Sequence, residues 1–127
     1  MPETVQTPLG EMWLTDDGIL FHRINEGLTI SSGDAAAVQS AVLELTGGRP
    51  VPAVVDMRAV GYAERAARDM FGASTEETSE SATALIVGST ASRTMAKAFM
   101  AMGPKRPIEI FTSEAEAMDW ARSQLDE

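Results

Sequence analysis

The residues best placed for chemistry follow a short apolar run. Val51–Val55 carry no charge, and the run ends at Asp56 and Arg58. A short apolar run flanked by turn residues is typical of a strand buried on both faces of a sheet. Open α/β sheets bind their ligands at the carboxyl ends of such strands. The next residues, 59–62, provide no nucleophile, metal-ligand cluster or phosphate-binding loop, so the segment indicates a binding surface more than a catalytic centre.

A second group of polar residues follows the next apolar segment. Its members are Ser89, Thr90, Ser92 and Arg93, at the expected start of a helix. Free backbone amides at a helix start can hold an anion. The same hydroxyl residues cap helices without any ligand, and their spacing matches neither the Walker nor the dinucleotide motif. Both interpretations, an anion site and a helix cap, stay open.

The sequence gives little support for an enzyme. The single histidine, His22, lies inside an expected strand and has no companion ligands, which is typical of a packing or surface residue. Catalysis would require His22, Asp56, Arg58 and Ser89 to converge, and no pattern in the sequence brings them together. Three acids precede the strand expected over 82–87, namely Glu76, Glu77 and Glu80. They favour the first turn of a helix over a metal site. We therefore predict no catalytic residue, no metal ligand and no cofactor.

Charge and composition narrow the partners. The net charge of −9 argues against nucleic acid, because phosphate binding needs a cationic surface. The segment between Glu80 and Glu109 contains no acid and carries a charge of +4 from Arg93, Lys97, Lys105 and Arg106. It predicts either a basic helix face that balances an acidic body or a local site for an anion or acidic partner. The chain contains no cysteine and no apolar run long enough to span a membrane, and its start lacks the features of a signal peptide. We expect a cytoplasmic protein.

The order of elements predicts an α/β fold. We expect a flexible tail over residues 1–10 and a single domain over residues 11–127. Within the domain, alternation and turn residues predict a hairpin (Glu11–Thr15 and Ile19–Ile24 around a turn at 16–18), with a further turn at 25–27. The remaining pattern predicts helices over 35–46, 62–71, 76–81, 93–102 and from 113 onward, and strands over 51–55, 82–87 and 108–111. Such alternation favours a mixed, mostly parallel sheet opened by a β-hairpin, with about four helices.

The expected helix over 93–102 is rich in methionine. Met95, Phe99 and Met102 fall on one stripe, with Met100 beside it. Such a stripe usually packs in a core, but flexible thioethers also form adaptable binding surfaces. One of these methionines can therefore face a partner subunit or a small apolar ligand. A homodimer is possible through this helix or through the hairpin edge.

Three segments together resemble the STAS-like family of small bacterial proteins, in its uncharacterised branch. The segments are Val54–Arg58, Ala84–Ser89 and Ile110–Trp120, and the similarity extends from about Glu11 to the end of the chain. The resemblance implies the fold of sulfate-transporter domains and anti-sigma-factor antagonists. In those antagonists a phosphorylatable serine or threonine follows the aspartate at the end of the central strand. Residues 56–62 of this chain contain no such hydroxyl apart from that of Tyr62, so the phosphoserine switch is not expected here.

Three functional hypotheses follow. The first is a non-catalytic regulatory or protein-interaction module that binds an unknown protein through Asp56, Arg58, Tyr62 and Arg65. The second is a domain that binds a small ligand, either an anion at residues 89–93 or a lipid-like apolar molecule against the methionine-rich helix. The third is an enzyme, which would need the four-residue convergence described above.

Overall fold

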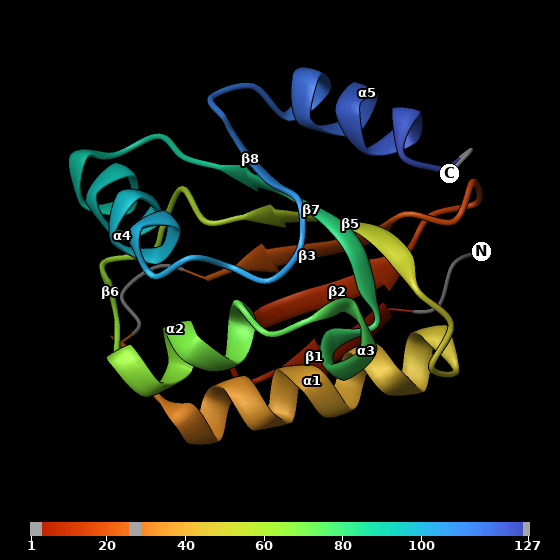
Figure 1. Ribbon diagram of the computed structural model, residues 1–127, viewed down its shortest axis with the longest axis horizontal. Coiled ribbons are helices and arrows are strands. Elements are labelled where there is room, and N and C mark those ends of the chain that lie inside the picture. Colours follow the sequence, from red (N-terminus) through yellow and green to blue (C-terminus); the bar gives the residue numbers. More distant parts are fainter. Residues whose placement is uncertain (1–3, 26–28, 126–127) are drawn as a thin grey trace.

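A six-stranded mixed sheet forms the centre of the protein. The computed structural model describes residues 4–25 and 29–125. The strands lie in the order β1 (Thr4–Thr7), β2 (Gly10–Leu14), β3 (Leu20–Ile24), β5 (Val51–Asp56), β7 (Glu80–Ile86) and β8 (Ile108–Phe111) (Figure 1). The pairs β1–β2 and β2–β3 are antiparallel, whereas β3, β5, β7 and β8 are mutually parallel. The predicted α/β fold with a mostly parallel sheet is confirmed.

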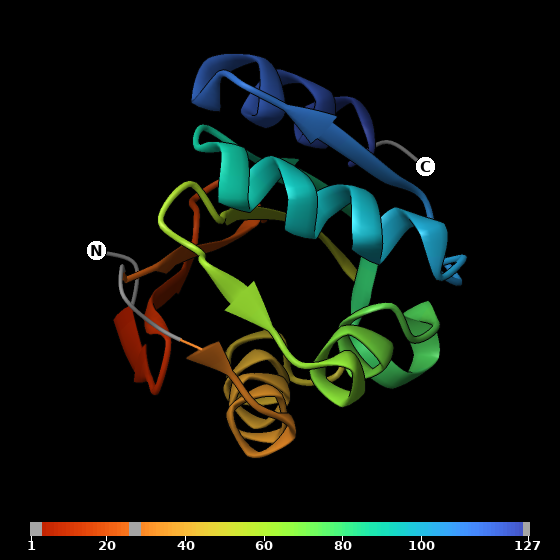
Figure 2. The ribbon, with the colours of Figure 1, turned by 90° about the vertical axis from the view of Figure 1, so that its left-hand side faces the viewer.

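The sheet buries apolar side chains on both faces. The larger core cluster includes Ala53 and lies beneath α1 (Ser32–Thr46), α2 (Arg65–Phe71) and α4 (Thr90–Ala101). The smaller cluster includes Val54 and lies beneath α5 (Glu114–Ser123). In Figure 2, α4 and α5 lie at the top of the view on either side of β8, while α1 and α2 lie at the bottom. The central strand is therefore covered on both faces, as its uncharged sequence predicted.

Local capping sets the ends of the longest helix. The Ser31 hydroxyl accepts from the Asp34 amide, and the Asp34 carboxylate accepts from the Ser31 amide, so two free donors are satisfied reciprocally. Gly47 ends the helix with φ 66°, a left-handed conformation that suits glycine. The predicted end of this helix is confirmed, but the helix begins at Ser32, three residues before the predicted start, because Ser31 provides its cap.

The N-terminal segment is part of the sheet, so the predicted tail is wrong from Thr4 onward. Strand β1 pairs with β2 over four residues, and the following Leu9 is buried. The Thr7 hydroxyl accepts from the amides of Leu9 and Gly10, which holds the tight turn between the strands. Gly10 is required there because an added Cβ would lie 2.0 Å from the Arg23 carbonyl oxygen. The predicted hairpin is confirmed, but β1 covers the hairpin edge that we expected to be free.

A second, two-stranded sheet replaces the first part of the helix predicted over 62–71. Strand β4 (Thr29–Ile30) pairs in parallel with β6 (Tyr62–Ala63). The amide of Glu64 then donates to the Ile30 carbonyl, and α2 begins only at Arg65. The pairing partner lies more than 30 positions away in the chain, so helical spacing alone could not reveal this strand. The predicted turn at 25–27 falls partly outside the described residues.

The other predicted bounds need smaller corrections. The piece expected over 76–81 is the single turn α3 (Thr75–Thr78), because Glu80 and Ser81 already belong to β7. Helix α4 begins at Thr90, three residues before the predicted start, because Ser89 provides its cap. The described residues contain five helices, against about four expected for the fold, because the single turn α3 counts as a helix of its own. None of these helices is long and apolar enough to cross a membrane.

Candidate functional site

Four charged side chains gather at the carboxyl ends of the parallel strands. Arg23 lies at the end of β3, Asp56 ends β5, Arg58 follows it, and Glu114 begins α5. Hydrogen bonds and ion pairs connect all four, and we call them the edge cluster. Parallel strands end at the same edge of a sheet, which is why residues so distant in sequence meet here.

Arg58 binds Asp56 in a two-point contact. Its Nε donates to Oδ1 over 2.9 Å, and its Nη2 donates to Oδ2 over 2.7 Å. The Arg58 amide also donates to Oδ1, so the loop backbone and the side chain hold the same carboxylate. The Asp56 side chain is only 8% exposed, whereas the Arg58 side chain is 45% exposed. A buried acid thus holds a half-exposed guanidinium in one orientation.

Arg23 completes the cluster from the neighbouring strand. Its Nε donates to Asp56 Oδ2 over 3.2 Å, and its Nη2 donates to Glu114 Oε1 over 2.9 Å. The guanidinium also lies over the stacked rings of Trp13 and Phe21, 5.7 and 5.1 Å from their centroids. These rings restrict Arg23 and add a cation–π attraction.

The cluster keeps Asp56 ionised. Burial alone would raise the pKa of Asp56, but the hydrogen bonds from Arg58 and the charges of Arg58 and Arg23 hold that pKa below its ordinary value. The hydrogen bonds to Asp56 raise the pKa of Arg58 in turn. A carboxylate in this state is suited to fixing a cation and not to exchanging protons near neutral pH.

The start of α4 lies against the edge cluster. The Ser89 hydroxyl donates to the Arg58 carbonyl oxygen over 3.4 Å. A Cβ added to Gly88 would lie 3.1 Å from Cγ of Arg58, so the arginine stem lies close to this glycine. The two groups of residues singled out in the sequence, one around Arg58 and one around Ser89, are therefore neighbours in the structure.

Two of the four predicted anion-binding residues are used in capping α4. The Ser89 hydroxyl accepts from the Ser92 amide, and the Ser92 hydroxyl accepts from the amides of Gly88 and Ser89. Ser92 is also completely buried. Thr90 and Arg93 are exposed at the same helix end. The capping interpretation accounts for Ser89 and Ser92, while an anion bound near Thr90 and Arg93 stays a prediction.

Tyr62 and Arg65 lie outside the hydrogen-bonded cluster. Tyr62 belongs to β6 and is 47% exposed, and Arg65 is exposed on the first turn of α2. Among the described residues, no hydrogen bond or ion pair connects either of them to Asp56 or Arg58. Both follow the edge cluster closely in the chain, and their exposure leaves them accessible to a partner.

His22 lies on the opposite face of the sheet from Asp56. Successive side chains of a strand point to opposite faces of the sheet. Arg23 pairs with Asp56 and shares its face, whereas the preceding residue, His22, pairs with Val55 on the other face. The imidazole is buried, its Nε2 lies 3.2 Å from the Thr7 hydroxyl, and burial lowers its pKa to about 4. The convergence that an enzyme would require is not formed, because the sheet separates His22 from Asp56.

Sequence reasoning missed several charged residues. Arg23 and Glu114 complete the edge cluster. The sequence placed Arg23 near the end of a strand and Glu114 at the start of a helix, and these positions could have indicated that both lie at the edge of the sheet. Arg106 was counted in a basic segment, yet its side chain is only 3% exposed and pairs with Glu80 over 3.1 Å. The basic segment is therefore not a continuous surface patch. Within residues 4–25 and 29–125, no group of three or more His, Asp or Glu side chains could hold a metal ion.

Comparison with known proteins identifies a family but no activity. The domain of unknown function DUF7793 matches residues 12–125, and the chain belongs to that family. No curated protein matches the chain. Among solved structures, the chain is similar to an uncharacterised protein of the DUF3478 family with a SpoIIAA-like fold, from Shewanella loihica PV-4. That similarity has a TM-score of 0.59 at 13% identity and covers 95% of this chain and 92% of the other, so it shows the fold alone. The predicted STAS-like fold of an uncharacterised family is confirmed.

Proposed function

We propose that this DUF7793 domain is a non-catalytic protein-interaction module that binds a regulatory partner at the carboxyl edge of its sheet. The binding surface consists of Asp56, Arg58, Tyr62 and Arg65. The observation that carries the proposal is the two-point contact between the buried Asp56 and the half-exposed Arg58.

The contact prepares Arg58 for recognition. Arginine and tyrosine are enriched among the residues that dominate binding energy at protein interfaces. A side chain that is already fixed loses less conformational entropy on binding, so more of its interaction energy contributes to affinity. The outward face of the Arg58 guanidinium can donate to a carboxylate of the partner while Asp56 holds its inner face.

The chemistry of the edge supports binding over catalysis. Asp56 is held ionised by two arginines, and His22 lies across the sheet with a pKa of about 4. Neither group is a candidate for general acid–base catalysis near neutral pH at this edge. This supports the first of the three hypotheses over the third.

Control of the interaction differs from the phosphoserine switch of the related antagonists. In those proteins a phosphorylatable hydroxyl residue follows the aspartate at the end of the central strand. In this chain the same region contains a permanent cation, Arg58, two residues after Asp56. A phosphate would make this surface anionic, whereas Arg58 keeps it able to bind an acidic segment at all times. We therefore propose a constitutive interface whose regulation lies in the partner.

Affinity capture with three forms of the protein tests this proposal. The wild-type domain, Arg58→Glu and Arg49→Glu are each used as bait in lysate from the native cells. Arg49 is exposed just before β5, at the opposite end of that strand, so its substitution changes the charge equally at a distant site. A partner that depends on the edge is retained by wild type and Arg49→Glu and lost with Arg58→Glu.

Binding of the purified partner then provides the decisive measurement. Loss of a charge-assisted contact together with charge reversal should weaken binding at least tenfold for Arg58→Glu. Arg49→Glu should bind within about twofold of wild type. Equal affinity of all three forms would show that the partner binds elsewhere, and the proposed surface would be wrong.

A further inference from the structure

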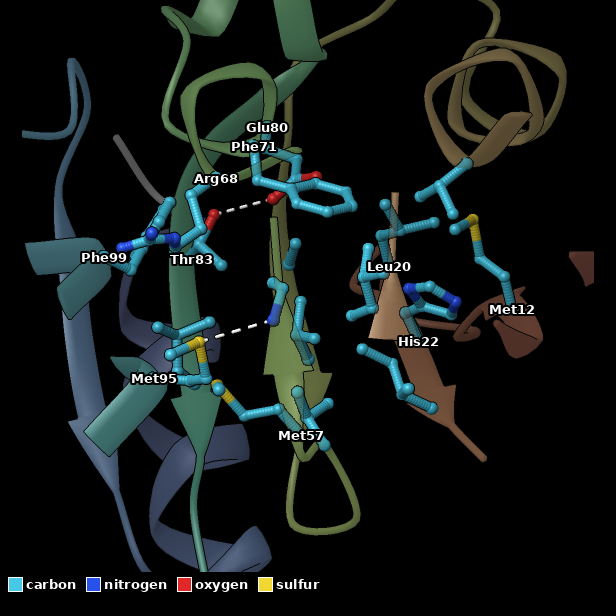
Figure 3. A pocket seen from close by; sticks show the side chains of 18 of the residues that line it. Met12, Leu20, His22, Met57, Arg68, Phe71, Glu80, Thr83, Met95 and Phe99 are labelled. Carbon is cyan, nitrogen blue, oxygen red and sulfur yellow. Dashed lines mark hydrogen bonds between the residues drawn. The ribbon is translucent and has the colours of Figure 1, made fainter. Parts of the chain in front are cut away.

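An internal cavity lies between the sheet and the helices that cover its larger cluster. Its volume is about 90 Å³, and its wall is mostly apolar. Figure 3 shows Met12, Leu20 and His22 on one side of this space and Met57, Met95 and Thr83 across from them. An apolar cavity stays free of water when its walls provide no hydrogen-bond partners, and it can then accept a small apolar molecule.

The cavity is not filled because several of the side chains around it are small or flexible. Ala53 of β5 and Ala63 of β6 have only a methyl side chain each, and three methionines (Met12, Met57 and Met95) also line the wall. Unbranched thioether side chains change rotamer readily and can adapt to the shape of a ligand. Met100 of the methionine-rich helix is instead exposed at the surface.

Most polar groups in the wall are already satisfied. Arg106 donates to Glu80 and to the Thr83 hydroxyl, and the Thr83 hydroxyl donates to Glu80 over 2.7 Å. His22 is next to the Thr7 hydroxyl and is neutral at pH 7, because burial lowers its pKa to about 4. These groups offer no unpaired charge to a ligand.

Arg68 is the exception. Its Nε is fully buried and has no hydrogen-bond partner. Its guanidinium also forms no ion pair with another described residue. Leaving a buried donor without an acceptor costs free energy, and it costs more when the group is charged. An acceptor supplied by a ligand would remove that cost.

Arg68 also lies between the cavity and the surface. Together with Phe99 it lines both the internal cavity and a surface groove of about 630 Å³ beside α2 and the end of α4. A ligand with an apolar tail in the cavity can therefore place a polar head beside Arg68 at the inner end of this groove.

We propose that the cavity binds a short branched aliphatic carboxylate. Its alkyl tail occupies the space between Met12, Met57 and Met95, and its carboxylate accepts from the guanidinium of Arg68. This site is separate from the carboxyl edge of the sheet and does not depend on the proposed protein interaction.

The cavity volume limits the length of the tail. An apolar cavity of about 150 Å³ can hold the six carbon atoms of benzene, so 90 Å³ corresponds to about three or four carbon atoms. A branched chain of this length suits a rounded space better than an extended one. The carboxylate satisfies the buried Nε of Arg68 with a charge-assisted hydrogen bond, which a neutral head cannot match.

The eight methionines of the chain provide an internal map of the binding site. We would label their methyl groups with ¹³C and titrate the full chain with 3-methylbutanoate by NMR. The isosteric amide, 3-methylbutanamide, serves as the neutral matched probe. The resonances of Met12, Met57 and Met95 should shift with saturation, while that of Met118, a residue of α5 that packs on the opposite face of the sheet, should stay fixed.

Three variants separate the head from the tail. Arg68→Met keeps the apolar stem but removes the charge, so it should weaken 3-methylbutanoate at least tenfold and leave the amide within about twofold. Arg65→Met removes an exposed charge from the same helix and should leave both affinities unchanged. Ala53→Val narrows the cavity and should weaken both probes together.

Any of three results would overturn the assignment. Equal affinity for the carboxylate and the amide in the wild-type protein would remove the role of Arg68. A saturating shift of Met118 would place the ligand elsewhere, and no shift of the three cavity methionines at about 50-fold excess of probe would exclude binding in the cavity. Arg58→Glu should bind both probes as wild type does, so this experiment is independent of the interaction surface.

Discussion

Arg106 forms an ion pair with Glu80 inside the domain, with 3.1 Å between Nη2 and Oε1. The same guanidinium donates to the Thr83 hydroxyl and to the carbonyl oxygens of Phe71 and Ala73. One side chain thus connects β7, the end of α2 and the turn before β8. A buried ion is tolerated only when it is paired and hydrogen-bonded. The many hydrogen bonds of Arg106 therefore explain how this pair can be buried.

We expect Arg106→Met to destabilise the protein strongly. The substitution leaves Glu80 buried without its partner, and breaking a buried pair in this way typically costs about 3–5 kcal/mol. The measurement is the free energy of unfolding from urea titration. Arg93→Met, at an exposed site on α4, should change it by less than about 0.5 kcal/mol. A similar small effect of both substitutions would contradict the structural role of Arg106.

The stability of the protein should depend on His22 at mildly acidic pH. The pKa of His22 is about 4 in the folded protein and about 6.5 in the unfolded chain. Between these values the unfolded chain binds a proton that the folded protein does not, so stability falls as the pH decreases from 6.5 toward 4. The loss should reach about 3 kcal/mol. The check is the urea midpoint over this range in wild type and in His22→Gln, whose stability should fall less steeply; parallel curves would argue against a neutral buried histidine.

Asp56 should stabilise the protein only while it is ionised. Burial raises its pKa, but the hydrogen bonds and charges of Arg58 and Arg23 outweigh that effect and lower the folded pKa below the unfolded value of about 3.9. The contribution is therefore present above about pH 3.9 and is lost as the pH falls through the folded pKa. Asp56→Asn should cost about 1–3 kcal/mol at pH 7 and nothing once Asp56 is protonated. Thermal or urea unfolding from pH 7 to pH 2 measures the difference, and Asp119→Asn, at an exposed site, should show a smaller one.

Gly88 should be coupled energetically to Arg58. Gly88→Ala would place its Cβ 3.1 Å from Cγ of Arg58, closer than ordinary packing allows. In an Arg58→Ala background that contact disappears, and the alanine should stabilise the protein by about 0.4–1 kcal/mol through the unfolded state. In the wild-type background the gain should be absent. A double-mutant cycle should therefore give a coupling of at least about 0.5 kcal/mol. Additive effects would mean that the arginine stem does not rest on Gly88.

The sequence determined the elements whose limits are local. The uncharged run Val51–Val55 predicted the central strand, and helical spacing over 35–46 predicted α1 and its end at Thr46. These predictions are confirmed because caps, turns and periodic burial depend on neighbours within about four residues. The order of these elements was enough to predict a mostly parallel α/β sheet.

Part of the candidate site followed from the same reasoning. Asp56 and Arg58 were expected at a strand end, and the structure adds Arg23 and Glu114 because parallel strands finish at one edge. The function of this edge and of the group around Arg93 stays a prediction. The proximity of Ser89 to Arg58 depends on β5 and β7 being neighbours in the sheet, and the strand order was not predicted from the sequence.

Only the tertiary structure decided where long-range partners pair. Strand β1 and the β4–β6 pair have short, weakly patterned sequences whose hydrogen bonds are satisfied by distant segments. The burial of Arg106, the placement of His22 across the sheet from Asp56, and the cavity beside Arg68 arise in the same way. Each depends on which surfaces the packed elements bring together, and a packing arrangement is a property of the whole chain that no local pattern encodes.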